Sequence, residues 1–430
     1  MSIRVAHFLQ RYPPALGGSE AYFARLGRYL TACGDRVTVF TSNALDLEAF
    51  WSRDGRCLPS GISDDNGVSV CRYRLWHCPG RRYVFKALSF VPWRPLQRLA
   101  VGCNPICPGM WRDAGRPVGH FDAVHATAFP YTFPIVCGLR LARRLGVPFL
   151  LTPFLHLGDP LNPLDRTRRA YTAPALLSLA HAADAIFAQT AGERDALLAS
   201  GIPAARVILQ GLGVDAAECS GGDRAAARRQ WGAVANEVVV GHLANNSEEK
   251  GTVDLLRAAE MLWRRGRRFR VILAGPEMPN FCRFWDNFSA RMPGLPVKRL
   301  GVLSEDGKRD FFAGLDVFAL PSRSDSFGLV LLEAWANGLP NLAYRAGGVA
   351  ELIRDDVDGL LVGCGDMEGL AAALERLVDN AELRYRLGRA GQERLATEFR
   401  WEAKLDLVRE VIRERVTLFS RLRVSSSALR

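Results

Sequence analysis

The chain has 430 residues, enough for two domains with separate cores, because a single core stops growing at about 250–300 residues. A hydrophobic content of 48% and a charged content of 23% describe an ordinary soluble globular protein. The net charge of +11 comes from scattered arginines and not from a compact basic stripe with interleaved aromatic residues, so nucleic acid is not an expected partner. An anionic membrane surface or a phosphorylated lipid acceptor suits this charge better.

Cysteine spacing and hydropathy give no sign of a zinc protein, a secreted protein or a membrane-spanning protein. The ten cysteines include no Cys-x2-Cys pair, which argues against a zinc site, although four of them (Cys71, Cys78, Cys103 and Cys107) share one loop-rich region and leave a metal or redox role there as an alternative. The first apolar run is too short for a signal peptide, and no window approaches the roughly 18 apolar residues of a membrane-spanning helix. The expected location is the cytoplasm, including the inner face of the membrane.

The first 41 residues predict a βαβ unit. A buried strand at 3–9 is followed by Gly17-Gly18, by a helix with apolar residues at helical spacing, and by a second strand at 36–41. The glycine pair lets a backbone approach a ligand closely at the carboxyl edge of a parallel sheet. The sequence there is Gly-Gly-x-Glu and not G-x-G-x-x-G, so a nicotinamide cofactor is not predicted.

Residues 43–120 are expected to form an irregular basic and aromatic insertion. The segment contains RYRLWHCPGRRYVFKALSFVPWRPL, and only 68–75 is compatible with a strand. Such a segment could lie on a membrane surface or form a lip around an acceptor, and the alternative is a packed insertion with solvated arginines.

Further strands and helices follow in alternation. The remaining strands of the N-terminal half are predicted at 121–125, 147–152, 182–189 and 207–209, with a capping box at Thr190 and Glu193. In the C-terminal half they are predicted at 238–241, 269–274, 297–303, 316–320 and 360–362. Helices are predicted after 367, with a long helix at 401–416 and a frayed tail at 421–430.

The stretch from Leu320 to Leu352 carries the most specific chemistry. A strand ends at Pro321, a small polar loop follows, and a helical pattern with Gly328 in its first turn ends at Gly338. Free amides at such a helix start attract an anion. Asp325 and Glu333 do not bind a phosphate, so sugar hydroxyls are their natural partners. An anion site beside two hydroxyl acceptors indicates a nucleotide-sugar; the alternative is a surface Asp and a buried, satisfied Glu.

The acid-x7-Glu spacing around Phe-Gly-Leu resembles the donor site of the retaining glycosyltransferases of family 4, and the resemblance covers nearly the whole chain. It implies an α/β protein of the GT-B fold, with two facing, doubly wound Rossmann-like domains and a cleft between them. The expected parts are an N-terminal acceptor-binding domain at 1–215, a linker at 216–235, a nucleotide-sugar-binding domain at 236–395, and a crossover helix and tail at 396–430.

The resemblance also assigns residues. Donor contacts are implied for the glycine pair Gly17 and Gly18, for Lys250 at a helix start, for the loop glycine Gly275, and for Phe327, Gly328, Leu329 and Glu333. Catalytic positions are implied for His156, Asp325 and Lys250, and an acceptor-side position for His125. The family usually has an arginine where this chain has His242, which is assigned to the donor site in its place. Asp325 is one methylene shorter than the family's glutamate.

The implied function is transfer of a sugar from a nucleotide-sugar to an acceptor hydroxyl, with retention and without a metal or other cofactor, in the synthesis of a surface polysaccharide or glycolipid. Lipid-linked or saccharide acceptors and a peripheral membrane contact are the expected partners. Two alternatives stay open at this point. One is a binding protein of the same fold that has lost turnover, favoured by His242 and Asp325. The other is a sugar-nucleotide epimerase.

Overall fold

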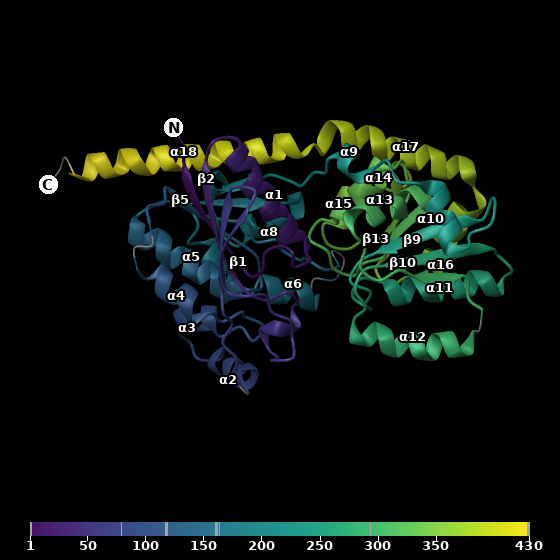
Figure 1. Ribbon diagram of the computed structural model, residues 1–430, viewed down its shortest axis with the longest axis horizontal. Helices are drawn as coiled ribbons and strands as arrows, with labels where there is room; N and C mark the ends of the chain where they lie inside the picture. The colour runs from purple at the N-terminus through teal and green to yellow at the C-terminus, as the bar shows by residue number, and fades with distance from the viewer. Residues whose placement is uncertain are drawn as a thin grey trace. The chain divides into compact units, whose positions relative to one another are not determined.

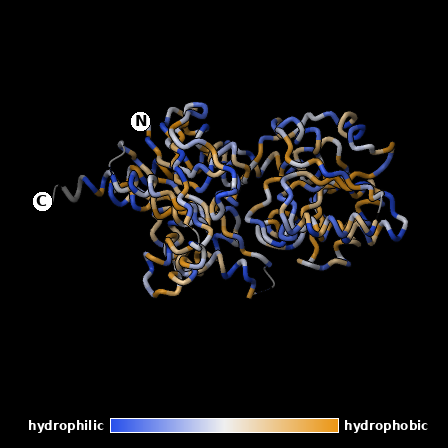
Figure 2. Tube along the Cα trace, turned by 60° about the horizontal axis from the view of Figure 1, so that its bottom comes forward, coloured by the Kyte–Doolittle hydropathy of each residue, from blue (hydrophilic) through white to orange (hydrophobic). Residues whose placement is uncertain are grey.

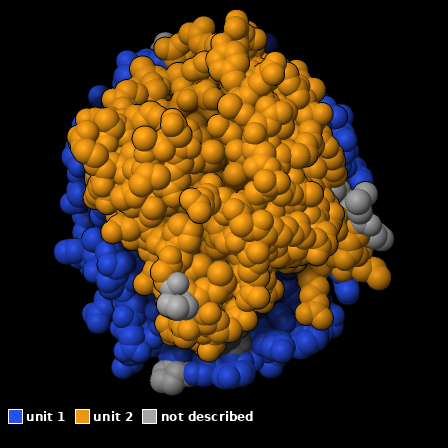
Figure 3. Space-filling view, turned by 90° about the vertical axis from the view of Figure 1, so that its right-hand side faces the viewer, with its two compact units in different colours: residues 1–155, 169–210, 405–430 blue, residues 156–168, 211–404 orange. Residues whose placement is uncertain are grey.

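A computed structural model describes residues 2–78, 80–116, 119–159, 162, 164–292 and 294–427. The chain divides into two compact units. Unit 1 contains residues 1–155, 169–210 and 405–430, and unit 2 contains residues 156–168 and 211–404; Figure 3 colours the two units separately. Each unit is an α/β domain built on one largely or wholly parallel sheet, as the alternation of strands and helices predicts.

Unit 1 has an eight-stranded sheet in the order β3-β4-β2-β1-β5-β6-β7-β8. Its strands are β1 (Arg4–Leu9), β2 (Arg36–Ser42), β3 (Gly61–Asp65), β4 (Val68–Tyr73), β5 (Ala123–Ala126), β6 (Phe149–Leu151), β7 (Ala185–Ala188) and β8 (Val207–Leu209). The helices are α1 (Gly18–Ala32), α2 (Arg81–Leu88), α3 (Arg94–Leu99), α4 (Pro108–Ala114), α5 (Thr132–Leu145), α7 (Pro174–Ala180) and α8 (Ala191–Ala199), with 3-10 turns η1 (Glu48–Phe50) and η2 (Ala204–Arg206). Figure 1 labels most of these elements.

The segment 43–120 is more regular than its sequence suggests. Strand β4 pairs in parallel with β2, and β3 pairs antiparallel with β4 at the edge of the sheet. Asp65 at the end of β3 accepts a hydrogen bond of 2.7 Å from the Tyr12 hydroxyl and pairs with Arg28 at 2.9 Å. Strand β4 lies within the predicted 68–75, whereas β3 was not predicted, because it is exposed and lacks the apolar alternation by which a strand is recognised.

Unit 2 has a six-stranded parallel sheet in the order β11-β10-β9-β12-β13-β14. Its strands are β9 (Val238–Leu243), β10 (Phe269–Ala274), β11 (Val297–Arg299), β12 (Val317–Leu320), β13 (Asn341–Tyr344) and β14 (Gly359–Val362). Its helices are α9 (Ala216–Cys219), α10 (Arg224–Trp231), α11 (Thr252–Arg264), α12 (Pro279–Arg291), α13 (Glu305–Gly314), α14 (Leu329–Ala336), α15 (Val349–Leu352), α16 (Met367–Asp379) and α17 (Ala381–Glu398). Hydrophobic stretches run through the interior of each unit (Figure 2).

Two segments differ from the sequence prediction at the ends of unit 2. The linker 216–235, for which one short helix was predicted, holds two helices, α9 and α10. Asp316 holds α10 against the sheet by accepting hydrogen bonds from Arg224 at 2.6 Å and from Arg228 at 3.0 Å. The predicted frayed tail is helical as far as Ser427, because it belongs to α18 (Trp401–Ser427); its last residues, 428–430, lie outside the described residues. Helices α6 (Arg166–Tyr171) and α18 contain residues of both units.

Within the described ranges, none of the helices combines the length and the apolar character that crossing a membrane requires.

The core of unit 1 encloses two histidines that its sheet places side by side. His7 on β1 and His125 on β5 are fully buried and lie opposite each other in the parallel register, with ring centroids 5.6 Å apart. Burial lowers the pKa of His7 to about 3, and burial together with His7 lowers the pKa of His125 well below its usual value. Both rings are therefore neutral near pH 7.

We expect unit 1 to lose stability as the pH falls from 7 to 5. The unfolded chain takes up a proton at His7 near pH 6.5, whereas the folded chain does so only near pH 3. Protonation of such a histidine in the unfolded chain therefore lowers the free energy of unfolding by about 2 kcal/mol between pH 7 and pH 5. Urea denaturation should show this loss reduced by about 2 kcal/mol in His7→Phe, which keeps a ring but cannot titrate.

Phe23→Leu is the matched control, because Phe23 packs against both histidines and carries no proton. It should lower stability equally at both pH values. A His7→Phe variant with the wild-type pH dependence would contradict the argument.

Candidate active site

The centre of the sheet in unit 2 is a topological switch point. From β9 the chain adds β10 and β11 on one side, then crosses to add β12, β13 and β14 on the other. Strands β9 and β12 are parallel neighbours, and the pairing of Val317 with Val240 brings their carboxyl ends to the same level. Loops that leave two such strand ends diverge and leave a crevice for a ligand. Lys250 and Asp325 lie on these two loops.

Three predicted catalytic residues are brought together here. The Lys250 Nζ donates to Asp325 Oδ2 at 2.7 Å and to the Ser324 carbonyl at 3.4 Å, so the loops after β9 and β12 are joined by an ion pair. His156, which belongs to unit 2, lies with Nδ1 3.1 Å from Ser324 Oγ. The side chains of Lys250 and Asp325 are 25% and 18% exposed, so solvent reaches the pair only partly.

Glycines allow the backbone around this pair to approach so closely. Gly251 begins α11 with φ of 74°, and a Cβ there would lie 1.8 Å from the Pro321 carbonyl oxygen. Gly347 has φ of 55°, and a Cβ there would lie 2.2 Å from the Asp325 carbonyl oxygen, which accepts from the Gly348 amide at 2.9 Å. Both positions require glycine on steric and conformational grounds. The Gly347-Gly348 pair thus packs directly against the backbone of Asp325 and holds this loop in place.

The electrostatics fix the protonation states of this cluster. Burial alone would raise the pKa of Asp325, but the charge of Lys250 and the hydrogen bonds to its carboxylate lower that pKa below its usual range. Burial lowers the pKa of His156 to about 4, and Lys250 adds to this effect against the opposing charge of Asp325. Near pH 7 the site therefore contains an aspartate anion and a neutral imidazole, which can accept one hydrogen bond and donate another.

The loop from Asp325 leads directly into α14. Gly328 is the N-cap, with φ of 89°, and Leu329 is the first helical residue, so the backbone amides at this end are not used by the helix itself. The Phe327 amide donates to the Asp325 carboxylate, whereas its ring is buried against Phe399. Phe327 therefore contributes its backbone to the loop and its side chain to the core.

Glu333 is held by a residue that sequence reasoning missed. Its Oε1 accepts from Lys308 Nζ on α13 at 2.6 Å. Burial tends to lower the pKa of Lys308, but Glu333 outweighs burial and raises it. The only sequence signal was Lys308 itself, which precedes the donor stretch; the pairing depends on how α13 and α14 pack. The donor role of Glu333 stays a prediction.

His242 does not have the exposed position that a donor contact needs. It is fully buried in β9, its Nδ1–H donates to the Ala319 carbonyl at 2.8 Å, and its Nε2 accepts from the Thr252 hydroxyl at 2.9 Å. Burial lowers the pKa of His242 to about 4, so the ring is neutral. The expectation that this side chain binds the donor is wrong, because both of its nitrogens are used to join β9 to β12 and to the start of α11.

Gly275 follows β10 and lies against the neighbouring loop. Its φ is 107°, and a Cβ there would lie 2.0 Å from the Ala244 carbonyl oxygen. Its amide donates to the Gly301 carbonyl at 2.7 Å. The glycine therefore lets the loops after β9 and β10 touch, and its expected donor contact stays a prediction.

In unit 1, the predicted residues fall at the corresponding switch point between β1 and β5. A Cβ on Gly18, at the start of α1, would meet nothing within 4 Å, whereas one on Gly17 would lie 2.2 Å from a carboxylate oxygen of Glu20. Glu20 is buried and paired with Arg11 at 2.8 Å. An internal carboxylate therefore already lies at this helix start, which the sequence did not reveal.

His125 is not available for direct contact with an acceptor. It is fully buried, and its Nε2 lies 2.8 Å from Thr152 Oγ1. Its ring packs among Phe23, Phe187 and His7. The prediction of an acceptor-side histidine is wrong, because the predicted strand end lies inside the sheet and the ring faces the core.

Among the described residues, no cluster of three or more His, Cys, Asp or Glu side chains is arranged to hold a metal ion.

Comparison with known proteins covers both units. A family model for glycosyl transferases group 1 matches residues 223–394, and one for a glycosyl transferase 4-like domain matches residues 17–213. A D-inositol 3-phosphate glycosyltransferase of Saccharomonospora viridis is 32% identical over 355 residues, which cover 76% of this chain and 79% of the relative. The sulfoquinovosyl transferase SQD2 of Arabidopsis thaliana is 27% identical over 415 residues, covering 94% and 72%.

Solved structures share the fold. Sucrose-phosphate synthase from Thermosynechococcus elongatus superposes with a TM-score of 0.72 at 22% identity, covering 97% of this chain and all of that one (100%). HepE of Anabaena, solved in complex with UDP-glucose, gives a TM-score of 0.70 at 19% identity, covering 96% and 100%. With both family models matched in order and two Rossmann-like units present, the chain belongs to the group 1, family 4 glycosyltransferases of GT-B fold.

Proposed function

We propose that this glycosyltransferase moves a sugar from a nucleoside-diphosphate sugar to an acceptor hydroxyl, retains the anomeric configuration and needs no metal ion. The observation that carries the proposal is the pairing of Lys250 with Asp325 at the switch point, beside the amides that begin α14. An ammonium and a helix start together compensate the charge of a departing diphosphate. The solved complex of HepE with UDP-glucose supports a donor of this class.

The residues then have separate roles. Lys250 and the amides of Gly328 and Leu329 bind the diphosphate, and Asp325 and the neutral ring of His156 hold sugar hydroxyls. Glu333 accepts hydrogen bonds from the ribose hydroxyls while it also remains paired with Lys308. The bond between the anomeric carbon and the diphosphate oxygen breaks, and Lys250 compensates the charge of the leaving oxygen. The acceptor hydroxyl forms the new bond to the anomeric carbon on the same face, and its proton passes to the departing diphosphate.

For the acceptor, we propose a hydroxyl of a phosphorylated sugar or cyclitol, free or carried on a lipid, in the synthesis of a glycolipid or polysaccharide. Two similar proteins are named for related chemistry, a D-inositol 3-phosphate glycosyltransferase and a sucrose-phosphate synthase. The net charge of +11 suits an anionic acceptor.

A peripheral contact with an anionic membrane is also part of the proposal. The sequence from Asn66 to Arg112 contains eight Lys and Arg residues and no Asp or Glu. On and after α2, Tyr83, Phe90 and Trp93 are 78%, 77% and 61% exposed. Exposed aromatic rings among basic residues are typical of a segment that lies in the interface of an anionic membrane, such as the cytoplasmic leaflet.

We expect Lys250→Ala to lower the release of nucleotide from the donor by about a hundredfold or more, because a preorganised charge at the leaving group is lost. The measurement is nucleotide release from UDP-, GDP-, ADP- and TDP-sugars with a sugar phosphate as acceptor, with and without EDTA, and NMR of the product's anomeric configuration. Lys298→Ala is the matched control, since Lys298 is an exposed lysine on β11. Loss of nucleotide release in EDTA, a product of inverted configuration, or full activity in Lys250→Ala would contradict the proposal. Binding of a nucleotide without any release would indicate a binding protein. Exchange of solvent protons into the donor sugar would indicate an epimerase.

We expect the double variant Phe90→Ser and Trp93→Ser to bind anionic vesicles at least about tenfold more weakly, because each exposed ring contributes about 1.5–3 kcal/mol when buried. Co-sedimentation with vesicles of phosphatidylcholine and phosphatidylserine measures this. Tyr385→Ser is the control, since Tyr385 is 66% exposed on unit 2. Equal binding to pure phosphatidylcholine vesicles, or an equal loss in the control, would contradict the membrane contact.

A further inference from the structure

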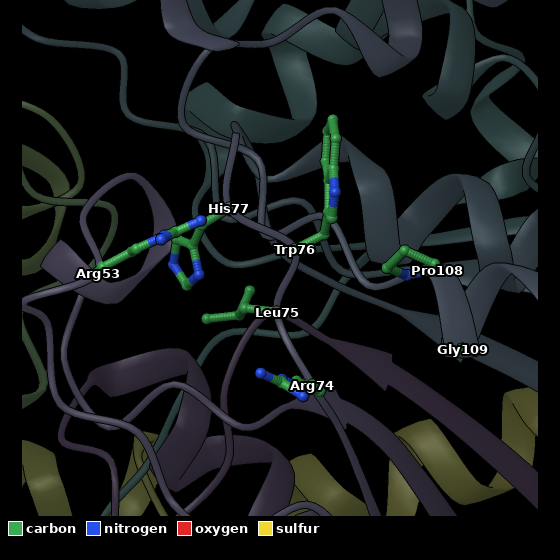
Figure 4. A pocket seen from close by; sticks show the side chains of 7 residues that line it. All are labelled: Arg53, Arg74, Leu75, Trp76, His77, Pro108 and Gly109. Carbon is green, nitrogen blue, oxygen red and sulfur yellow. The ribbon is translucent and has the colours of Figure 1, made fainter. Parts of the chain in front are cut away.

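Unit 1 contains a pocket that none of the residues assigned above lines. Its volume is about 660 Å³, and its walls come from the loop after η1, the loop after β4 and the start of α4. In Figure 4, Arg53 and His77 lie toward one side, Pro108 and Gly109 toward the other, and Leu75 between them. A smaller pocket of about 340 Å³ shares Arg53 and His77 with it.

The pocket is formed by a loop that buried hydrogen bonds hold in place. The guanidinium of Arg81 is buried and donates to the carbonyls of Trp76, at 2.9 Å, of Asn104, at 3.0 Å, and of Phe50. The Trp76 amide donates to the Ile106 carbonyl at 2.8 Å. Three separate stretches of chain are thereby tied to the loop after β4, so the side chains of that loop are presented from a fixed backbone.

Two guanidinium groups line this pocket without a partner. Within the part of the chain that the structure describes, neither Arg53 nor Arg74 makes an ion pair or a hydrogen bond through its side chain, and both are exposed. Arg56, three residues from Arg53, is by contrast paired with Asp46 at 3.2 Å. The charge at the pocket is therefore uncompensated, and a planar guanidinium suits a phosphate or carboxylate.

The neighbouring groups add a donor and an aromatic face. His77 Nε2 donates to the Ala49 carbonyl at 2.6 Å, which fixes the orientation of the ring beside Arg53. Trp76 also lines the pocket and is 45% exposed, whereas its neighbour Leu75 is buried. An exposed indole face packs against the C–H face of a sugar or cyclitol ring.

We propose that this pocket binds a saccharide or cyclitol that carries a phosphate or carboxylate, with Arg53 and Arg74 on the anionic group and Trp76 on the ring. The inference rests on the proposed function, because the anionic ring is then part of the acceptor. It places recognition of the anionic group in unit 1, on side chains that the donor chemistry of unit 2 does not use. The anionic ring can be free in solution or part of a lipid headgroup.

The test measures direct binding of defined probes to the full chain by titration calorimetry. The probes are inositol 3-phosphate and glucose 6-phosphate, with myo-inositol and inorganic phosphate for comparison, and vesicles containing phosphatidylinositol for a lipid-borne headgroup. We expect Arg53→Ala and Arg74→Ala each to weaken binding roughly tenfold, the effect of losing a hydrogen bond to a charged group. Trp76→Ala should weaken binding of the ring-bearing probes roughly fivefold and leave inorganic phosphate unchanged.

Arg112→Ala is the matched control, since it removes one positive charge from the same acid-free segment outside the pocket, where Arg112 pairs with Asp113 at 3.4 Å. Binding of a soluble or a vesicle-borne probe that depends on Arg53, Arg74 and Trp76 but not on Arg112 supports the pocket and tells the two sources apart. Binding of no charged probe, an equal loss in Arg112→Ala, or inorganic phosphate bound as tightly as inositol 3-phosphate would overturn it.

UDP titrated in parallel separates this inference from the proposed function. If the chain binds UDP through Lys250 but binds no anionic ring, the proposed donor site is supported and only the pocket proposal is contradicted. A chain that binds neither contradicts both.

Discussion

The ion pair between Lys250 and Asp325 determines how the candidate site of unit 2 is arranged. It joins the loops that leave β9 and β12, the two neighbouring strands at which the order of strand addition reverses. An ion pair that is partly desolvated adds little net stability, because desolvation offsets much of its Coulomb attraction. Its effect is to hold a positive and a negative group at one place, with the Asp325 carboxylate kept ionised. The glycines at 251 and 347 follow from it, since only they let the backbones approach closely enough.

His242, which stands where the family resemblance implies an arginine, makes structural contacts but supplies no charge near pH 7. A neutral, buried ring joins β9 to Ala319 and to Thr252, and the Thr252 hydroxyl in turn accepts from the Ser247 amide at 3.1 Å. This chain of hydrogen bonds orders the loop that carries Lys250. The imidazole thus helps to order the loop of the lysine without supplying a charge of its own. In the proposed function, Lys250 and the amides of α14 are therefore left to compensate the charge of the diphosphate.

The sequence predicted the parts of the fold that periodicity and turn residues encode, and little that depends on packing between distant elements. The strands other than β3 and β13, the Thr190 cap, whose hydroxyl accepts from the Glu193 amide, and the loop at Asp325 lie where they were predicted. Helix α12 and the exposed edge strand β3 were not predicted. His125 and His242 were misjudged for one reason: a histidine at a predicted strand end has no pattern that says whether its ring faces a ligand or the core.

The two units use charge in opposite ways, and this has a consequence for binding. In unit 2, Lys250 is paired with Asp325, and Glu333 is paired with Lys308. A donor bound there as proposed would share these existing partners and would gain only the difference between the old and the new contacts. Such exchange favours orientation over affinity. In the pocket of unit 1, Arg53 and Arg74 have no partner to give up among the described residues, so an anion there gains the full hydrogen bonds less the cost of its own desolvation. If both proposals hold, we expect affinity for an acceptor to be set in unit 1 and geometry at the reacting sugar to be set in unit 2.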